Sequence, residues 1–217
     1  MPHRAAPTEP SPATEQLVAQ FTERVRTLGG AAWLAPGGRA DVRRRIVEAV
    51  RELTGDRSSE AGVPHVVAWA TDELGSLDLP GLLAELGTEY VPWRPNAESL
   101  AVARARLREA SATSVLGITA CAWAVAETGT LALYATAGTG RLPSLLPPAH
   151  LCLLRPGQIV QGVPEGLRLL SAYAAEHGAL PSTVNLVSGP SRSADIEGDI
   201  SIGVHGPGRL GVVIGDW

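Results

Sequence analysis

The sequence predicts an α/β fold: a Rossmann-like three-layer α/β/α arrangement with a mixed, largely parallel sheet. Three observations predict it. Helical patterns of apolar residues alternate with short apolar strands through roughly the first hundred residues. The strand expected at residues 66–70 is apolar at every position, as in a strand covered on both faces of a parallel sheet. The chain has 217 residues, enough for one such domain with a substantial core.

The N-terminal elements are expected to form a scaffold. Residues 1–12 are rich in proline and should be a disordered tail, which leaves residues 13–217 as a single domain. A first helix should end at Gly29 and Gly30, because glycine readily adopts the left-handed conformation of a helix end. The next elements are predicted as a strand at 31–35, a helix at 41–53, the strand at 66–70, a weak helix at 80–86, a strand at 89–92 and a helix that begins at Asn96 and ends near Ser111.

A strand from Val115 opens the second half and is expected to run on to Glu127. Along residues 120–126, three bulkier residues alternate with alanines, so one face carries bulk and the other almost none: Cys121, Trp123 and Val125 against Ala120, Ala122, Ala124 and Ala126. Gly129 should supply a positive φ angle in the tight connection to a strand at 130–135.

The C-terminal part continues the alternation of helices and strands. A helix at 164–178 is expected to turn Leu167, Leu170 and Ala174 toward the core. The other predicted elements are strands at 151–154, 184–187 and 210–214, and a short helical start after Ser191.

The composition excludes several classes of function. The formal net charge is −4 and no basic run is present, whereas nucleic-acid binding needs clustered positive charge. All 18 basic residues are arginine. Schiff-base enzymes, pyridoxal-phosphate enzymes and P-loop nucleotide hydrolases are therefore excluded, since each requires a lysine amine.

The cysteines and the hydropathy of the sequence restrict the possible sites and the location of the protein. Cys121 and Cys152 are the only cysteines, and each lies in an apolar run, so we expect buried core residues and no disulfide, zinc or cluster site. No segment reaches the roughly 18 uninterrupted apolar residues of a membrane span, and the N-terminus lacks the apolar core of a signal peptide. We therefore expect a cytoplasmic protein.

The first group of candidate site residues surrounds Glu127. A carboxylate at the end of a buried strand must find a partner or a wet cavity, because burying it unpaired is unfavourable. Glu127 is thus either a structural carboxylate that bonds turn amides or an arginine, or a catalytic residue. Thr128, Gly129 and Thr130 follow it directly and are candidate ligand contacts.

Two further candidates lie between the strands that follow. Gly140 and Arg141 place a guanidinium on a flexible loop, where it could grip a carboxylate or phosphate with two hydrogen bonds or simply be solvated. His150 begins a strand after two prolines. It is either a structural hydrogen-bonding residue or a proton shuttle.

The strand at 184–187 leads into a possible anion site. The residues Ser188-Gly189-Pro190-Ser191 should present free backbone amides to an anion, and the same amides would serve if the serines cap a helix. Asp195 and Glu197 follow in the same segment and are also candidate ligand contacts.

His205 lies between glycines just before the last strand. With Gly206 beside it, a ligand could approach the imidazole ring and the backbone together. We predict that this segment, the segment of Ser188 and the segment from Glu127 to His150 meet in one pocket.

Four motifs in the second half resemble those of the LUD domain family. They occur in the family order over about residues 110–214, whereas the first half agrees only in its rhythm of helices and strands. The motifs are Ala126-Glu127-Thr128-Gly129-Thr130, the segment from Gly140 to His150, the segment from Ser188 to Glu197, and Gly203-Val204-His205-Gly206-Pro207.

Within this family the chain is similar to the short lactate-utilisation C-type proteins. The resemblance implies a fold like that of the sugar-phosphate isomerase and CoA-transferase superfamily. It also implies a role beside iron–sulfur partner proteins in a system that oxidises L-lactate to pyruvate. We expect no cofactor or metal on this chain itself, and iron–sulfur clusters in the partners.

The mechanism suggested by these residues has three parts. Arg141 and the amides after Ser188 would hold a small carboxylate such as lactate, His205 or Glu127 would take the hydroxyl proton, and electrons would leave through a partner. Two alternatives remain open. One is a stand-alone CoA-transferase or isomerase-like enzyme with Glu127 as nucleophile, and the other is a non-catalytic assembly or metabolite-sensing subunit.

Overall fold

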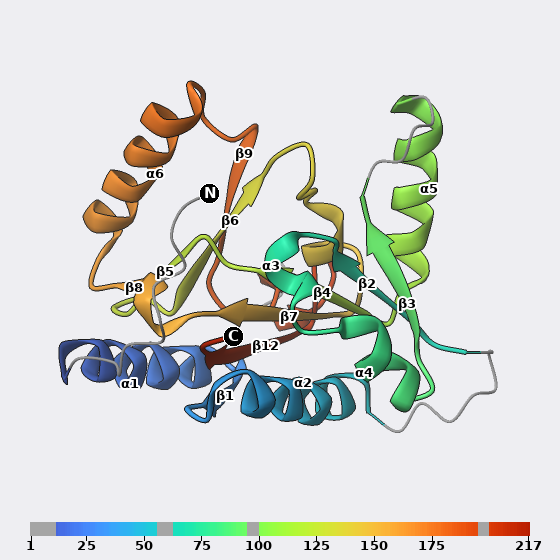
Figure 1. Ribbon diagram of the computed structural model, residues 1–217, viewed down its shortest axis with the longest axis horizontal. Coiled ribbons are helices and arrows are strands. Elements are labelled where there is room, and N and C mark those ends of the chain that lie inside the picture. Colours follow the sequence, from blue (N-terminus) through green and yellow to red (C-terminus); the bar gives the residue numbers. More distant parts are fainter. Residues whose placement is uncertain (1–11, 56–62, 95–99, 195–199) are drawn as a thin grey trace.

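The central sheet has six strands, and every neighbouring pair in it is parallel (Figure 1). The structure is a computed structural model that describes residues 12–55, 63–94, 100–194 and 200–217. The predicted α/β class with a largely parallel sheet is confirmed. In spatial order the strands are β1 (Ala31–Ala35), β12 (Arg209–Gly215), β7 (Ala149–Leu154), β4 (Leu116–Ala120), β2 (His65–Trp69) and β3 (Glu89–Trp93).

Helices cover both faces of this sheet. The helices α2 (Gly38–Thr54) and α4 (Leu79–Glu85) lie on one side, and α5 (Leu100–Thr113) lies on the other (Figure 1). Glycines in β12 let α2 approach closely. A Cβ at Gly211 would lie 2.8 Å from the Leu53 side chain, and one at Gly215 would lie 2.8 Å from Val42. The helix α1 (Pro12–Thr27) packs beside β1, and α3 (Asp72–Gly75) is a single turn after β2.

A second, smaller sheet stands on the α5 side of the molecule (Figure 1). Its strands, in spatial order, are β8 (Ile159–Val160), β5 (Trp123–Val125), β6 (Thr130–Ala135) and β9 (Thr183–Val187). The prediction of one strand from Val115 to Glu127 is wrong, because the chain changes sheets between Cys121 and Ala122. The Cys121 amide donates to the Leu153 carbonyl of β7, whereas the Ala122 amide donates to a carbonyl of β6.

The helix α6 (Val163–His177) lies against the small sheet, at the outside of the molecule (Figure 1). It approaches closely at Gly166, where a Cβ would overlap the Trp123 ring. It ends at Gly178 with φ 72°, as predicted. The expectation that Leu167 faces the core is wrong, since 52% of its surface is exposed. Leu170 is only partly buried. The reason is that α6 contacts the small sheet through Gly166, so only a narrow part of the helix surface is buried.

An antiparallel pair of strands begins where a short helix was expected after Ser191. Its strands are β10 (Arg192–Ala194) and β11 (Ile200–Ile202), paired antiparallel. The Ser191 amide donates to the Pro207 carbonyl at 2.8 Å, and the Gly203 amide donates to the Ser191 carbonyl at 2.9 Å. The segment before β12 therefore forms hydrogen bonds with the Ser191 amide and carbonyl, and the start of a helix would have left this amide unpaired.

The described ranges also contain two short 3₁₀ helices, η1 (Leu142–Ser144) and η2 (Pro156–Gln158). The segment that contains η1 crosses the face of the main sheet. At one end, the Trp69 indole N–H donates to the Gly140 carbonyl at 2.8 Å, beside the carboxyl end of β2. Farther along, Pro143 lies so close to Gly117 in β4 that a Cβ there would overlap the Pro143 carbonyl. The segment then enters β7 at its amino end.

Several predicted strands, glycines and cysteines have the positions that the sequence indicated. The predicted strands at 31–35 and 130–135 have the bounds of β1 and β6, and Gly129 has a φ of 64° as expected. Cys121 and Cys152 are both buried and free, which confirms them as core residues. The expected cap Asn96 and residues 1–11 lie outside the described ranges. Among the helices of those ranges, none is long and apolar enough to cross a membrane.

Candidate ligand-binding site

The structure brings residues from all three predicted segments to one cavity of about 200 Å³, which we call the histidine cavity. Two histidines, His150 and His205, belong to its wall. The full lining consists of Ser144, Leu145, His150, Leu186, Val187, Ser188, Gly189, Ser191, His205, Gly206, Pro207 and Leu210.

The histidine cavity lies near the amino ends of β7 and β12. His150 is the second residue of β7, and its register partner in β12 is Leu210. On the other side, His150 pairs with Gly117 of β4. Open α/β sheets usually bind ligands at the carboxyl ends of their strands. Fold analogy would therefore have directed attention to the opposite edge.

His150 is buried, with 1% of its surface exposed. Its Nε2 lies 2.9 Å from the Thr119 hydroxyl of β4, and its Nδ1 has no hydrogen-bond partner in the described part of the chain. Burial lowers the pKa of His150 from 6.5 to about 4, because a charged imidazole would lose its hydration. At neutral pH the ring is uncharged, so one nitrogen donates and the other accepts.

Ser188 connects the histidine cavity to the segment after Glu127. The hydroxyls of Thr128 and Thr130 lie 2.7 Å apart, and those of Thr130 and Ser188 lie 2.8 Å apart. These three groups form a continuous chain of hydrogen bonds that runs from an exposed threonine to the cavity wall. Thr128 and Thr130 therefore influence the cavity without lining it.

Backbone geometry shapes the rest of the wall. Gly189 has a φ of 86°, which other residues rarely adopt, and a Cβ there would lie 2.9 Å from Leu28. Gly206 packs on Ser191, whose Cβ would lie 3.3 Å from an added Cβ. In the described ranges, the amides of Gly189 and Gly206 donate no hydrogen bond within the protein. They are available to an anion.

His205 differs from His150 in its surroundings. Its side chain is exposed on the loop before β12, and it makes no hydrogen bond to any residue that the structure describes. An exposed imidazole at the mouth of a cavity can exchange protons with water. His205 is therefore better suited to the role of proton acceptor than the neutral, enclosed ring of His150.

The structure does not bring Glu127 or Arg141 to the histidine cavity. Glu127 is exposed beside the start of α6, where its Oε2 would lie 3.2 Å from a Cβ added at Gly162. The sequence placed Glu127 at the end of a buried strand, but the residue itself is exposed. Arg141 is exposed at the far end of the crossing segment, next to Gly140, which packs on the Trp93 ring.

Other predicted contacts are placed as follows. Gly129 packs on α1, with its missing Cβ 3.0 Å from that of Arg24. Pro190 lies between two residues that line the histidine cavity but is not part of the lining itself. Asp195 and Glu197 lie outside the described residues.

Sequence reasoning missed Thr119, which holds the His150 ring. A signal was present: Thr119 is the single hydroxyl-bearing residue in the otherwise apolar strand Leu116–Ala120. It is fully buried, and the only hydrogen bond of its side chain within the described chain is the one to His150. A lone threonine in a buried strand is common, so its partner could be identified only in three dimensions.

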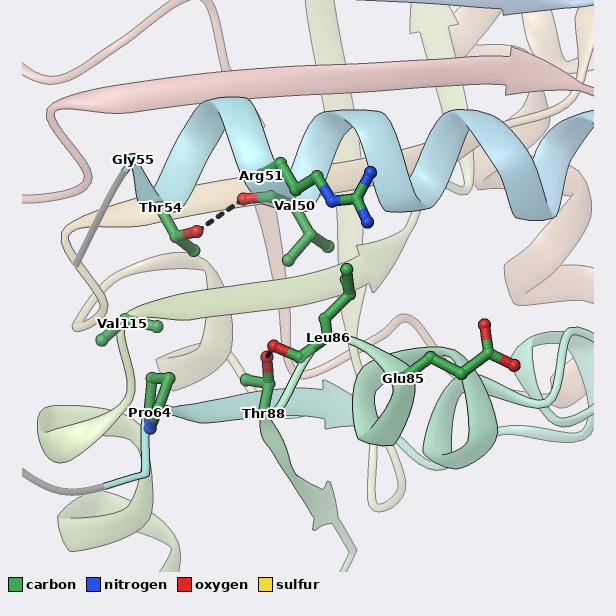
Figure 2. Close-up of a pocket in the computed structure, with 9 residues that line it drawn as sticks. All are labelled: Val50, Arg51, Thr54, Gly55, Pro64, Glu85, Leu86, Thr88 and Val115. Carbon is green, nitrogen blue, oxygen red and sulfur yellow. Dashed lines mark hydrogen bonds between the residues drawn. The ribbon is translucent and has the colours of Figure 1, made fainter. Parts of the chain in front are cut away.

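Two larger cavities lie elsewhere. One of about 400 Å³ is formed between α2, the end of α4 and the starts of β2 and β4 (Figure 2). The hydroxyls of Thr54 and Thr88, which line it, already donate to backbone carbonyls, at 2.7 and 3.4 Å. The other, of about 300 Å³, lies at the carboxyl ends of β1 and β12. Neither contains a predicted site residue.

The described residues contain no group of three or more histidine, cysteine, aspartate or glutamate side chains that could hold a metal ion. Burial raises the pKa of the Cys121 thiol well above its usual value. This thiol is therefore protonated at neutral pH and is a poor nucleophile and metal ligand.

The motifs and the fold define an α/β protein of the LUD domain type. A sequence model of the LUD domain family matches residues 18–214, so the chain belongs to this family. It is 32% identical over 174 residues to "Lactate utilization protein C" of Halalkalibacterium halodurans, a match that covers 80% of this chain and 72% of that protein. The protein of the same name in Bacillus licheniformis is 31% identical over 163 residues.

Coverage differs between these relatives. The match to the Bacillus licheniformis protein covers 73% of this chain but 65% of the relative, slightly less than two thirds of its length. A crystal structure of a "duf162 family protein" from Deinococcus radiodurans superimposes with a TM-score of 0.62 at 25% sequence identity. That similarity covers 93% of this chain and 97% of the Deinococcus chain, so it extends over both halves of the fold.

Proposed function

We propose that this chain serves lactate utilisation by binding a small 2-hydroxy carboxylate, with L-lactate as the first candidate, in the histidine cavity. The observation that carries the proposal is the convergence of His150, Ser188 and His205, from three separate segments, on one cavity. The names of the relatives supply the substrate class. A cavity of about 200 Å³ suits a small acid better than a large cofactor.

The carboxylate is bound at the wall formed by Ser188, Gly189 and Gly206. Their hydroxyl and amide groups donate hydrogen bonds, and a carboxylate only accepts them. The threonine chain supports this role. When Thr128 donates to Thr130 and Thr130 donates to Ser188, the Ser188 proton is left for the ligand. Arg141, which the sequence suggested for this grip, does not line the cavity and has no part in it.

Oxidation of L-lactate to pyruvate breaks the hydroxyl O–H and the α-carbon C–H bonds and releases two protons and two electrons. His205 accepts the hydroxyl proton, and the second proton passes to water. Side chains of these types cannot store two electrons. The proposal therefore includes an oxidised iron–sulfur partner protein, whose clusters take the electrons one at a time. Because Glu127 is exposed outside the cavity lining, we assign it no covalent or proton-transfer role.

A second candidate, a subunit that binds the ligand and a partner without catalysis, is favoured by one observation. Apolar side chains are exposed on the segments that form the histidine cavity. Leu186 is 55% exposed and Val204 is 58% exposed. Exposed apolar groups near a cavity mouth suit contact with another protein. Both candidates place the ligand in the same cavity.

Isothermal titration of L-lactate into the purified chain tests the binding proposal. Ser188→Ala should weaken binding about tenfold, because one hydrogen bond to a charged group is lost. Gln substituted for Glu127 should change it by less than about twofold, as expected for an exposed group outside the site. Equal affinity of the wild type and Ser188→Ala would contradict the proposed site.

Dye reduction by L-lactate in the reconstituted system separates the two candidates. His205→Ala should lower turnover at least about a hundredfold if His205 is the general base. Turnover that is unchanged at saturating lactate would favour the non-catalytic subunit. Glu127→Gln is the matched control, and full activity is expected for it.

A further inference from the structure

The two nitrogens of His150 are in different situations. Nε2 is paired with the Thr119 hydroxyl at 2.9 Å, whereas Nδ1 is buried and has no partner in the described part of the chain. A buried polar atom without a hydrogen bond is unfavourable and is rare in folded proteins. A group that enters from outside the protein can provide the missing partner.

His150 belongs to the lining of the histidine cavity, from which such a group would approach the ring. Within the described ranges, three buried side-chain atoms lack a hydrogen-bond partner: the Thr22 hydroxyl, the Arg45 Nε, which lies 3.8 Å from an Asp41 carboxylate oxygen, and the His150 Nδ1. Of these three residues, His150 alone lines any of the three cavities. The residue with the unpaired nitrogen therefore lines the cavity that carries the proposed function.

The chemistry of the ring restricts what it can bind. Burial holds the pKa of His150 at about 4, so the imidazole is neutral at physiological pH and attracts a carboxylate poorly. The Thr119 hydroxyl can donate to Nε2 or accept from it. Nδ1 is a donor in the first case and an acceptor in the second. It is therefore matched to an oxygen that is a hydroxyl in one ligand and a ketone in another.

We propose that His150 Nδ1 binds the α-oxygen of a 2-hydroxy or 2-keto acid, and that Thr119 is the positioning residue that fixes the ring tautomer. This inference rests on the proposed function, because it places the carboxylate at Ser188. With a hydroxy acid bound in its ground state, the hydroxyl donates a hydrogen bond to Nδ1 and Nε2 donates to Thr119. For oxidation the hydroxyl turns toward His205, which accepts the proton. With a keto acid bound, Nδ1 donates to the ketone and Thr119 donates to Nε2.

The arrangement has a consequence for specificity. An acid with an α-oxygen satisfies Nδ1, whereas an acid of the same length without one leaves it unpaired. Sites built to hydrogen-bond a substrate hydroxyl discriminate strongly against analogues that lack it. The histidine cavity should therefore distinguish L-lactate and pyruvate from propionate, although all three carry the same carboxylate.

Isothermal titration of the full chain with L-lactate, pyruvate and propionate tests this inference. The wild type should bind the first two at least about tenfold more tightly than propionate. His150→Phe keeps a ring but removes both nitrogens, and it should bring the three affinities to within about threefold by weakening L-lactate and pyruvate. Thr119→Val should also reduce the discrimination, and Thr119→Ser, which keeps the hydroxyl, should retain it.

Ser188→Ala separates failure of the inference from failure of the proposed function. It should weaken all three acids by a similar factor, because all share the carboxylate. If it weakens none, the proposed site is wrong. If it weakens all three while His150→Phe and Thr119→Val keep full discrimination, only the inference is overturned.

A spectroscopic measurement on the unmodified protein avoids any dependence on folding of the variants. With ¹⁵N-labelled histidine, the Nδ1 resonance of His150 should move toward the protonated position with pyruvate and toward the unprotonated position with L-lactate. Propionate should shift it little. Identical His150 spectra with all three acids would overturn the inference.

Discussion

The two ends of β7 carry polar residues in opposite states. At the amino end, His150 is buried with one nitrogen unpaired in the described chain. Just beyond the carboxyl end, Arg155 forms an ion pair with Glu73 and lies over the Trp217 ring, 4.2 Å from its centroid. Trp217 donates its indole N–H to the Glu73 carbonyl at 3.0 Å. The cluster of Glu73, Arg155 and Trp217 has these polar groups paired and stabilises the carboxyl edge of the sheet. The His150 Nδ1, in contrast, is available to a ligand.

The largest expected difference between the two ends concerns stability against pH. His150 has a folded pKa of about 4 and an unfolded value near 6.5, so the unfolded chain binds more protons between these limits. The free energy of unfolding should therefore rise with pH across this window. The stability that the neutral His150 ring contributes should be fully present above pH 6.5. Near pH 4 the free energy of unfolding should be lower by up to about 3 kcal/mol.

Urea unfolding of the wild type and His150→Phe at several pH values checks this effect. Carboxylates and other histidines contribute equally to both proteins, so the difference between the two curves isolates His150. A difference that does not change between pH 4 and 6.5 would show that the ring is solvated in the folded state.

Loss of the cluster at the other end should have a smaller effect that does not depend on the ligand. Arg155→Ala removes an ion pair with side chains about one-third exposed and a stacking contact on Trp217, and should lower the free energy of unfolding by about 1–2 kcal/mol. Lactate affinity should be unchanged. Arg44→Ala is the control, because the exposed pairs of Arg44 within α2 should be worth less than about 0.5 kcal/mol each. An equal loss in the free energy of unfolding for the two variants would show that Arg155 stabilises the fold no more than an exposed arginine does.

A still smaller effect should come from the threonine chain behind Ser188. Thr130→Val keeps the side-chain shape but breaks both hydrogen bonds, and should weaken lactate binding about fivefold. Thr130→Ser should bind like the wild type. In a Ser188→Ala background, Thr130→Val should have no further effect, because the two act through the same proton. Additive losses would mean that Thr130 acts independently of Ser188.

The smallest effect is expected for Arg141→Ala, which changes an exposed residue outside the cavity. Both the melting temperature and lactate affinity should be close to those of the wild type. A tenfold loss of affinity would show that the crossing segment rearranges to bring Arg141 to the ligand.

The sequence predicted the scaffold well where local patterns determine structure. Apolar runs bounded by glycine or proline gave strands such as β1 and β6 their observed limits. It did not predict the change of sheets after Cys121, because the largely apolar run continues without a glycine or proline from Ile118 to Ala126. A signal was present, since the bulky positions shift from Leu116 and Ile118 to Trp123 and Val125. The antiparallel pair after Ser191 was not predicted, because the run of serines and glycine from Ser188 to Ser191 suggested the start of a helix rather than a strand that pairs with β11.

The candidate site shows the same division between local and distant information. Local motifs identified His150, Ser188 and His205, and the structure brings these residues together. The exposure of Glu127 follows from the course of the small sheet, which no local pattern specifies. The contact between Thr119 and His150 joins neighbouring strands that are thirty-one residues apart in sequence, so only the sheet register reveals it.

A crystal structure of the chain with L-lactate bound tests the central claim most directly. We predict electron density for the ligand in the histidine cavity, with the carboxylate on Ser188 and the amides of Gly189 and Gly206. The α-oxygen should lie within hydrogen-bonding distance of His150 Nδ1. Lactate bound instead at Arg141 or Glu127, with the histidine cavity filled only by water, would contradict the account.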